Sequence, residues 1–294
     1  MKNIKTFVIK HPAAKWILRM INSAAGGYFL LIAVLYLFQA NLIFFPQKIT
    51  LEYASHLKAI YPNLREINIK TPDGAALHGW LLKNTAAKQT PLIIYYGGNG
   101  DEASWIIEDG LKLKNWSLLL MNYRGYGLSE GVPGEKCLCN DAIYVYDLFA
   151  RRKDVDKDGI VVMGRSIGSG VAVYVAERRP LRGVVLITPY DSVTSVARER
   201  MPFIPVSLIL KHRFESISRA PKIRSPVLVM VAEKDEVIPP WHAMRLAKAW
   251  GGETAVHVIK NAGHNTIQND DDYWRYIGDF LIRFLPRHER RTIR

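Results

Sequence analysis

The chain has 294 residues, of which 49% are hydrophobic, enough to bury the core of one large α/β domain or two smaller ones. Its formal net charge at pH 7 is +13, but this charge gathers at the two ends: Lys2, Lys5, Lys10, Lys15 and Arg19 near the start, and Arg283, Arg287, Arg290, Arg291 and Arg294, opposed by Glu289, near the end. Five positive charges at the start and a net four at the end leave +4 for the rest, so the sequence argues against a broad basic face and against nucleic acid as a partner.

The two cysteines, Cys137 and Cys139, are too few for a disulfide framework. A bridge between positions two apart would be strained, so we expect free, buried thiols.

The first long apolar stretch indicates a membrane anchor. Residues 24–38 carry no charged or strongly polar side chain, and apolar residues resume at Leu42 and continue to Phe45. As a helix, residues 24–45 would span about 33 Å, close to the thickness of a bilayer core. The basic residues precede the stretch, so the positive-inside rule predicts a single-pass helix with a cytoplasmic N-terminus and the remainder on the opposite side.

Two alternatives to a spanning helix stay open. A cleaved signal peptide would end in a small-x-small site, and Phe38-Gln39-Ala40 is a poor one. A monotopic helix would keep Gln39 and Asn41 at the membrane interface. Both the spanning helix and the monotopic helix would hold the rest of the chain close to lipid.

After the anchor, strand patterns alternate with helix patterns. Strands are expected at 64–69, 77–82, 91–96, 117–122, 161–165, 184–187, 227–231 and 256–259, and helices at about 102–113, 141–152, 171–177, 241–250 and 272–285. The first two strands form a hairpin around Thr71-Pro72-Asp73-Gly74. The alternation predicts a mostly parallel central sheet with helices on both faces.

The stretch from Tyr190 to Pro226 interrupts this alternation with about 35 residues that show no clear strand. It follows the carboxyl end of a strand, where such sheets bind ligands. We expect a small cap at about 191–225 that helps to line an apolar pocket. A packed surface excursion is the alternative.

The most informative stretch is Gly164-Arg165-Ser166-Ile167-Gly168-Ser169-Gly170, which lies between an apolar strand and a helix pattern. The glycines two before and two after Ser166 let strand and helix approach closely enough for a sharp, strained turn. Such a turn presents the serine hydroxyl above the carboxyl end of a parallel strand, beside the N–H of Ile167.

A serine hydroxyl is a weak nucleophile that needs a base, and the base needs an orienting acid. Asp235 and His264 each follow a predicted parallel strand, and the order serine, acid, histidine is the one this architecture uses. We therefore predict a triad of Ser166, His264 and Asp235. Glu236 and Asp191 are weaker candidates for the acid, and His257 lies inside a strand.

The developing oxyanion also needs donors. We predict that the N–H groups of Ile167 and Asn99 supply them, because Gly97-Gly98-Asn99-Gly100 follows a central strand that ends at the same edge of the sheet.

Two other motifs are incomplete. Residues 154–159 match the first half of a calcium loop, but the twelfth position is Arg165 where a glutamate is needed. Residues 122–127 look like a phosphate loop but lack the lysine and the following serine or threonine; we expect them to shape the wall beside the site. We therefore expect neither a metal nor a cofactor.

Together these motifs resemble the α/β-hydrolase superfamily over nearly everything after Pro46, and most of all its membrane-anchored serine hydrolases. The residues that carry the resemblance are 164–170, 122–131, 235–239 and 263–265. The likeness implies Ser166 as nucleophile, His264 as base, Asp235 as acid, and Ile167 and Asn99 as oxyanion donors. One departure is that Gly97 stands where the family usually has histidine, a change that retains the backbone donor.

These expectations combine into one organisation: a basic N-terminus and anchor at 1–46, followed by an α/β-hydrolase catalytic domain at 47–294. The expected activity is cleavage of carboxylic esters or thioesters, with a small-molecule or lipid ester as substrate. A serine peptidase of the same fold and a membrane-tethered binding protein without turnover are the alternatives. The sequence leaves the acyl length and the oligomeric state open.

Overall fold

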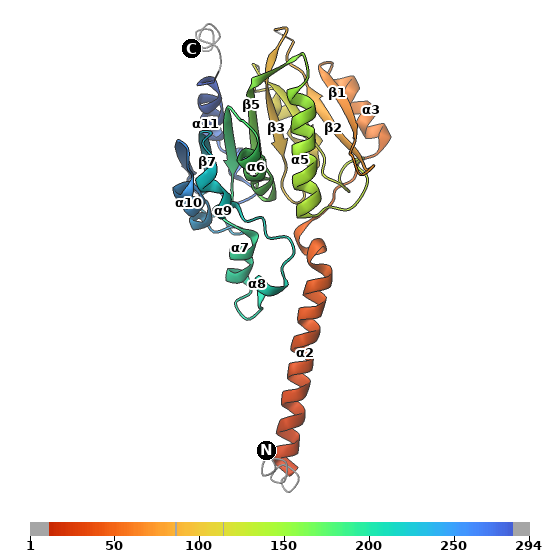
Figure 1. Ribbon diagram of the computed structural model, residues 1–294, viewed down its shortest axis with the longest axis vertical. Coiled ribbons are helices and arrows are strands. Elements are labelled where there is room, and N and C mark those ends of the chain that lie inside the picture. Colours follow the sequence, from red (N-terminus) through yellow and green to blue (C-terminus); the bar gives the residue numbers. More distant parts are fainter. Residues whose placement is uncertain (1–11, 86, 114, 285–294) are drawn as a thin grey trace.

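The computed structural model describes residues 12–284 except 86 and 114. An eight-stranded sheet with helices on both faces forms the body of the molecule, and a long helix extends from it as a rod (Figure 1). The basic residues Lys2, Lys5, Lys10, Arg287, Arg290, Arg291 and Arg294 lie outside the described residues.

The sheet confirms the predicted fold class. Its strands are β1 (Leu64–Lys70), β2 (Ala76–Leu82), β3 (Thr90–Tyr96), β4 (Ser117–Met121), β5 (Val155–Arg165), β6 (Gly183–Ile187), β7 (Val227–Ala232) and β8 (Thr254–Ile259), in the order β1-β2-β4-β3-β5-β6-β7-β8. The pairs β1·β2 and β2·β4 are antiparallel and all the others are parallel. The carboxyl ends of the parallel strands therefore meet at one edge.

Helices cover both faces of this sheet, and others form the cap beyond its edge (Figure 1). They are α3 (Leu51–Ile60), α4 (Ile107–Gly110), α5 (Glu135–Ala150), α6 (Ile167–Arg178), α7 (Val193–Arg200), α8 (Val206–Ile209), α9 (Ser216–Arg219), α10 (Pro240–Ala249) and α11 (Asp271–Ile282), with 3₁₀ turns η1 (Ala103–Ile106), η2 (Ala220–Lys222) and η3 (Ile267–Asn269). Helices α7, α8 and α9 lie in the expected cap segment.

The core has two layers because side chains alternate along each buried strand. On β3, Leu92 and Ile94 face the layer that contains α5 and α6, whereas Ile93 and Tyr95 face the layer that contains α11. Strands β4, β6 and β7 and residues 160–164 of β5 are buried on both faces, which is why they read as apolar runs.

The rod is helix α2 (Pro12–Ile43), and its stretch Lys15–Ile43 is long and apolar enough to cross a membrane. It joins the body at the carboxyl edge of the sheet. There Phe44 is buried with its ring 5.3 Å from that of His212, and the Phe45 N–H donates to the Asn99 carbonyl at 2.9 Å. The Gly127 N–H donates to the Gln47 carbonyl at 2.7 Å, so the end of the helix is attached to two loops of the edge.

Candidate active site

Ser166 lies in the sharp turn between β5 and α6. Its backbone torsion angles are φ 50° and ψ −120°, a conformation that a non-glycine residue rarely adopts. The flanking glycines are required by close approach: a Cβ atom on Gly164 would lie 2.4 Å from the Gly168 carbonyl oxygen, and one on Gly168 would lie 2.1 Å from that of Tyr96. The strained turn thus depends on both glycines.

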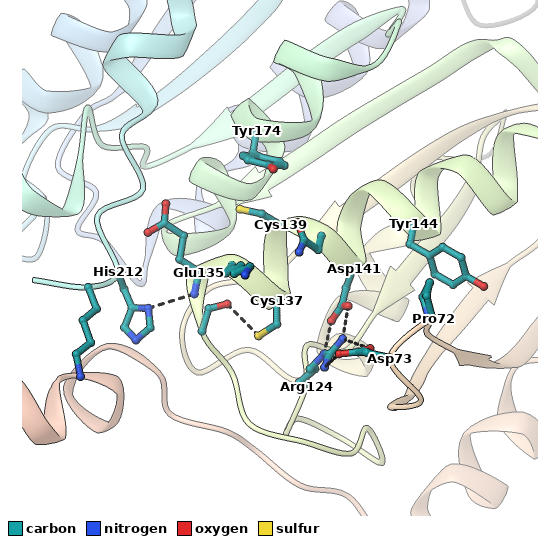
Figure 2. Close-up of a pocket in the computed structure, with 14 residues that line it drawn as sticks. Pro72, Asp73, Arg124, Glu135, Cys137, Cys139, Asp141, Tyr144, Tyr174 and His212 are labelled. Atoms are coloured by element: carbon teal, nitrogen blue, oxygen red, sulfur yellow. Dashed lines mark hydrogen bonds and ion pairs between the residues drawn. The ribbon is translucent and has the colours of Figure 1, made fainter.

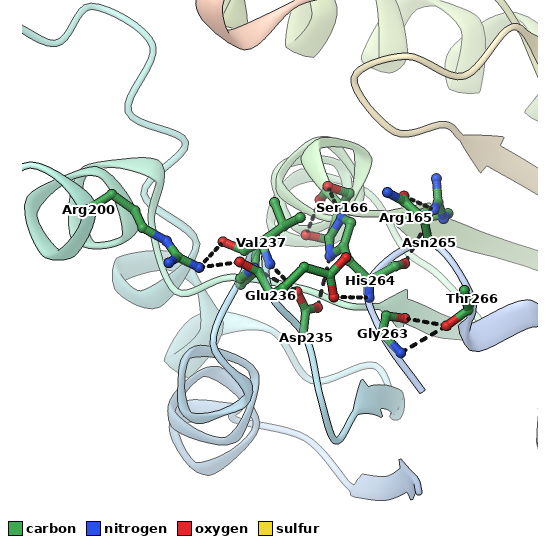
Figure 3. Close-up of polar contacts among 12 residues, drawn as sticks. Arg165, Ser166, Arg200, Asp235, Glu236, Val237, Gly263, His264, Asn265 and Thr266 are labelled. Carbon is green, nitrogen blue, oxygen red and sulfur yellow. Dashed lines mark hydrogen bonds and ion pairs between the residues drawn. The ribbon is translucent and has the colours of Figure 1, made fainter. Parts of the chain in front are cut away.

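The structure brings the three predicted triad residues together (Figure 3). His264 Nε2 lies 3.0 Å from Ser166 Oγ, and His264 Nδ1 lies 2.8 Å from Asp235 Oδ2. The other carboxylate oxygen of Asp235 accepts the N–H groups of Val237 and Ile238 at 2.9 and 2.7 Å. These two bonds fix the carboxylate so that Oδ2 faces the imidazole.

The weaker acid candidates have other partners. Asp191 is buried, and its Oδ1 lies 2.8 Å from His242 Nδ1, while Arg245 approaches Oδ2 at 3.1 Å. Burial raises the pKa of Asp191, but His242 and Arg245 outweigh that effect and leave the pKa below its ordinary value. Glu236 accepts the backbone N–H of His264 at 3.2 Å.

His257 packs its ring against that of Tyr276 at 3.8 Å. The buried Asp191–His242 pair is a feature that sequence reasoning missed.

The two expected oxyanion donors lie in the turn and in the loop after β3. Ile167 is the first residue of α6, so its N–H is among those that a helix leaves without an intrahelical partner. The Asn99 N–H meets no acceptor among the described residues. The Asn99 carbonyl is fixed, because it accepts from the Tyr126 hydroxyl at 2.5 Å as well as from Phe45.

The loop after β3 is held without the histidine that Gly97 replaces. The Gly97 carbonyl accepts from the Tyr123 hydroxyl at 2.9 Å, and the Gly98 N–H donates to Asp101 Oδ2 at 2.6 Å. Tyr123 and Tyr126 belong to the glycine-rich stretch 122–127, which therefore supports this loop rather than a phosphate.

Arg165 links three parts of the site, and sequence reasoning did not single it out. Its guanidinium donates to both oxygens of Asp101 at 3.0 Å and to Asn265 Oδ1 at 2.9 Å. Asp101 holds the loop after β3, and Asn265 follows the triad histidine. Arg165, directly before the serine, therefore fastens both loops to the turn. Its position inside the glycine–serine motif is the feature of the sequence that could have indicated this role.

A separate cavity of about 800 Å³ lies beside α5 and has no triad residue in its lining (Figure 2). Within it, Arg124 forms ion pairs with Asp73 and Asp141, each at 2.7 Å. Cys137 and Cys139 also line it as free thiols, and burial raises the pKa of Cys139 to about 12. That thiol is therefore a poor nucleophile near neutral pH.

The first carboxylate of the incomplete calcium motif forms ion pairs with two basic side chains. Asp154 accepts from Arg152 and from Lys83, at 2.9 and 2.7 Å. Among the described residues, no group of three or more histidine, cysteine or acidic side chains is arranged to hold a metal ion.

Comparisons with known proteins relate the whole arrangement to one family. Residues 134–288, just over half of the chain, match the family described as "Prolyl oligopeptidase family". An uncharacterized protein of Mycobacterium tuberculosis is 32% identical over 249 residues, which cover 84% of this chain and 87% of that protein. An uncharacterized membrane protein of Saccharomyces cerevisiae is 30% identical over 224 residues, 74% of this chain and 79% of its own.

Two further comparisons are with a hydrolase-domain protein and with the solved structure of an esterase. The alpha/beta hydrolase domain-containing protein WAV2 of Arabidopsis thaliana is 25% identical over 284 residues, 88% of this chain and 92% of that protein. Among solved structures, an esterase of Pyrococcus furiosus superposes with a TM-score of 0.65 at 18% identity and covers 82% of this chain and 97% of its own. The structural likeness concerns the fold alone.

Proposed function

The chain belongs to the prolyl oligopeptidase family within the α/β-hydrolase superfamily, and from this premise we propose that it is a membrane-anchored serine hydrolase of carboxylic esters or thioesters. Its hydrolase character follows from the family. The serine chemistry and the ester preference are the proposal. The observation that carries them is the continuous contact from Asp235 through His264 to Ser166, at 2.8 and 3.0 Å.

In the proposed reaction His264 Nε2 takes the proton of Ser166 Oγ as the oxygen attacks the substrate carbonyl. Asp235 holds the imidazole in the tautomer that leaves Nε2 free to accept, and it stabilises the imidazolium that forms. The N–H groups of Ile167 and Asn99 donate to the oxyanion, and loss of one such donor typically lowers turnover about 100- to 1000-fold.

The tetrahedral intermediate then collapses to an acyl-enzyme. His264 gives its proton to the leaving alkoxide or thiolate, so that the carbonyl carbon keeps its bond to Ser166 Oγ and loses its bond to the leaving group. A water molecule, deprotonated by His264, attacks the acyl-enzyme and releases the acid, and the proton returns to Ser166.

We propose that residues 1–46 anchor the protein and that residues 47–294 form the catalytic domain, with a cap at 191–225. The apolar stretch Lys15–Ile43 and the similarity to a yeast membrane protein support anchoring. By the positive-inside rule, the N-terminus lies in the cytoplasm and the catalytic domain on the opposite side. Proximity to lipid makes a lysophospholipid, a monoacylglycerol or an acylated protein a reasonable substrate.

Hydrolysis of p-nitrophenyl esters of increasing acyl length, by the protein and by Ser166→Ala in detergent, tests the proposal. We expect the substitution to lower kcat at least about 1000-fold. A fluorophosphonate should label Ser166 in the folded protein. Equal inactivity of both proteins on every ester, together with no labelling, would favour the tethered binding protein without turnover.

A peptidase is the second candidate, because the description of the matched family names an oligopeptidase. Peptide p-nitroanilides distinguish the two activities. Under the ester proposal, kcat/KM for the best ester exceeds that for every anilide after correction for intrinsic leaving-group reactivity. A higher value for an anilide with proline before the scissile bond would replace the ester proposal with the peptidase.

A further inference from the structure

The tip of the cap is an uncharged stretch between basic residues. Residues 201–210 read Met-Pro-Phe-Ile-Pro-Val-Ser-Leu-Ile-Leu and carry no charge. Arg198 and Arg200 precede this stretch, and Lys211 and Arg213 follow it. Phe203 and Leu208 are 87% and 83% exposed, so the two large side chains have almost no protein around them. We call residues 201–210 the cap tip.

The cap tip lies along the candidate membrane span rather than over the sheet (Figure 1). The Tyr28 hydroxyl donates to the Phe203 carbonyl at 2.7 Å. Near the other end of the tip, Gln39 donates to the Ile209 carbonyl at 3.2 Å and accepts the Lys211 N–H at 2.6 Å. The tip therefore follows α2 from Gln39 down to Tyr28.

This contact uses one face of α2. Tyr28, Ile32, Leu35 and Gln39 recur at helical spacing, and of these Ile32 and Leu35 are half-buried and Gln39 is buried, whereas residues 29–31 are exposed. The remaining faces of α2 expose large apolar side chains, among them Phe29, Leu30, Leu37 and Phe38. The apolar surface of the cap tip is thus continuous with that of the span.

Most backbone carbonyls of the cap tip, other than those of Pro202 and Leu208, have a hydrogen-bond partner, which favours an apolar medium because an unpaired N–H or C=O group costs several kcal/mol there. Pro202 and Pro205 have no N–H to satisfy. Carbonyls that accept a hydrogen bond are those of Met201, Phe203, Ile204, Pro205, Val206, Ser207, Ile209 and Leu210. Two of these bonds come from the Arg213 guanidinium and two from side chains of α2.

The length of α2 fixes how deep the cap tip would lie. From Arg19 to Gln39 the helix rises about 30 Å, the thickness of a bilayer core. We place the two boundaries of the core at Arg19 and Gln39, which shifts the span toward the N-terminus relative to the residues 24–45 considered from the sequence. Tyr28 lies eleven residues, or about 16 Å, from Gln39, close to the midplane. Lys211, whose Nζ lies 3.9 Å from the centre of the Tyr36 ring, is one turn from the boundary, within reach of lipid headgroups.

We propose that the cap tip, residues 201–210, is inserted beside α2 into the leaflet that adjoins the body of the protein, with Phe203 and Leu208 among the acyl chains. This inference rests on the membrane span in the proposed function but not on the hydrolytic chemistry.

Site-directed fluorescence on the full chain in phosphatidylcholine vesicles tests the insertion. Cys137→Ser and Cys139→Ala remove the native thiols, and a circular dichroism spectrum and a cooperative thermal transition equal to those of the wild type check that this background folds. An environment-sensitive fluorophore is then attached at Phe203→Cys or Leu208→Cys. Leu31→Cys serves as the control within the span, and Lys157→Cys, at the amino end of β5, as the control in water.

For both cap positions we expect strong quenching by phospholipids that carry a nitroxide on the acyl chain, as at position 31. We also expect iodide quenching at least about five-fold weaker than at position 157. Iodide quenching equal to that at position 157, with position 31 still quenched by lipid, would overturn the insertion and leave the span intact.

Two other outcomes would also overturn the inference. Access of iodide to position 31 would contradict the assignment of α2 as a membrane span, and with it the insertion of the cap tip. It would leave the proposed serine chemistry untouched. Shielding of the cap positions from iodide without quenching by lipid nitroxides would show that protein, such as a second copy of the chain, covers the cap tip.

Discussion

Two buried aspartates each approach a histidine at 2.8 Å, but the two pairs differ in what faces the second imidazole nitrogen. His264 Nε2 faces the hydroxyl of Ser166, whereas His242 Nε2 faces the Glu199 carboxylate at 3.3 Å. Of the two pairs, only the first therefore places a hydroxyl against its imidazole, as the proposed triad requires. The second pair ties the segment before α7 to α10, and Glu199 of α7 approaches the same histidine.

The chain offers a matched control for the triad acid. Asp235→Asn should lower kcat about 1,000- to 10,000-fold, because the amide favours the tautomer in which His264 Nε2 carries the proton. Asp191→Asn, an equally buried substitution beside a histidine, should change kcat by less than about threefold. Ester hydrolysis by the two variants decides the assignment, and a similar loss in both would contradict it.

Arg165 should act as a positioning residue. Arg165→Lys keeps the charge but removes the planar fork that joins Asp101 to Asn265. We expect kcat to fall about tenfold with little change in KM, because a looser loop after β3 weakens the oxyanion donors and not substrate binding.

Affinity for a boronic acid, which mimics the tetrahedral intermediate, should fall in proportion to kcat. Arg178→Lys, at the far end of α6, is the control and should alter neither quantity. A parallel rise in KM with constant kcat would instead show a role in binding.

The proximity of Ser166, Asp235 and His264 could be predicted because the topology of a parallel sheet leaves little choice of position. Ser166, Asp235 and His264 each follow a strand whose carboxyl end lies at one edge, so their order along the chain places them near one another. The pairs Arg165–Asp101 and Asp191–His242 join residues 64 and 51 positions apart through side-chain rotamers. No periodicity or spacing in the sequence encodes such contacts.

At the scale of elements, Glu177 joins the end of α6 to the segment that closes the cap. Its carboxylate accepts from Lys222 at 2.9 Å and bonds closely to Arg219, and its side chain is only 11% exposed. Burial raises the pKa of Glu177, but the hydrogen bonds from Lys222, Arg219 and Arg178 outweigh that effect and lower it to about 2.

This lowered pKa gives a stability prediction with a definite sign. The unfolded chain binds the proton at a pKa of 4.5 and the folded chain at about 2, so the stabilisation is complete above pH 4.5 and is lost as the pH falls toward 2. Glu177→Gln should therefore destabilise the folded state by about 1–2 kcal/mol at pH 7, a value reduced for the solvent around the cations.

Thermal unfolding in detergent at pH 7 and at pH 3 measures this effect. The difference in Tm between the wild type and Glu177→Gln should shrink at the lower pH. A difference of equal size at both pH values would contradict the ion-pair origin.

The strands matched their expected ranges closely, apart from the earlier start of β5 at Val155, because continuous apolar runs mark buried parallel strands. Helices were harder to place. The helix expected at 102–113 is a 3₁₀ turn followed by the single turn of α4, because the Glu102 carboxylate caps Ser104 and accepts from Asn122 in a buried network. Helix α5 begins at Glu135, six residues before the expected start, and α3 was not expected.

At the scale of the whole molecule, α2 and the triad lie at the same edge of the sheet. The anchor joins at Phe44 and Phe45, beside the loop after β3, and the serine turn follows the neighbouring strand β5. The edge that carries the proposed triad therefore faces the side on which we propose that the membrane lies.

This orientation predicts how the rate depends on a lipid substrate. In vesicles that hold the protein and a long-chain ester, the rate should follow the mole fraction of ester in the bilayer and fall when inert phospholipid dilutes it at constant bulk concentration. Colorimetric or mass-spectrometric assay of the released acid measures this. A rate that follows bulk concentration alone would mean that substrate reaches the site from water.

The attachment of Phe45 to the Asn99 carbonyl makes the anchor a mechanical part of the site. A tether of flexible residues would let the helix tilt or shift without consequence, but here a shift of α2 would act directly on the Asn99–Gly100 peptide unit, next to the N–H that we propose as an oxyanion donor. Bilayers thicker or thinner than the span load the helix through hydrophobic mismatch. Under the proposed function we therefore expect turnover to depend on the lipid composition of the surrounding membrane, and we expect an unrelated transmembrane segment grafted in place of α2 to localise the domain without restoring that dependence.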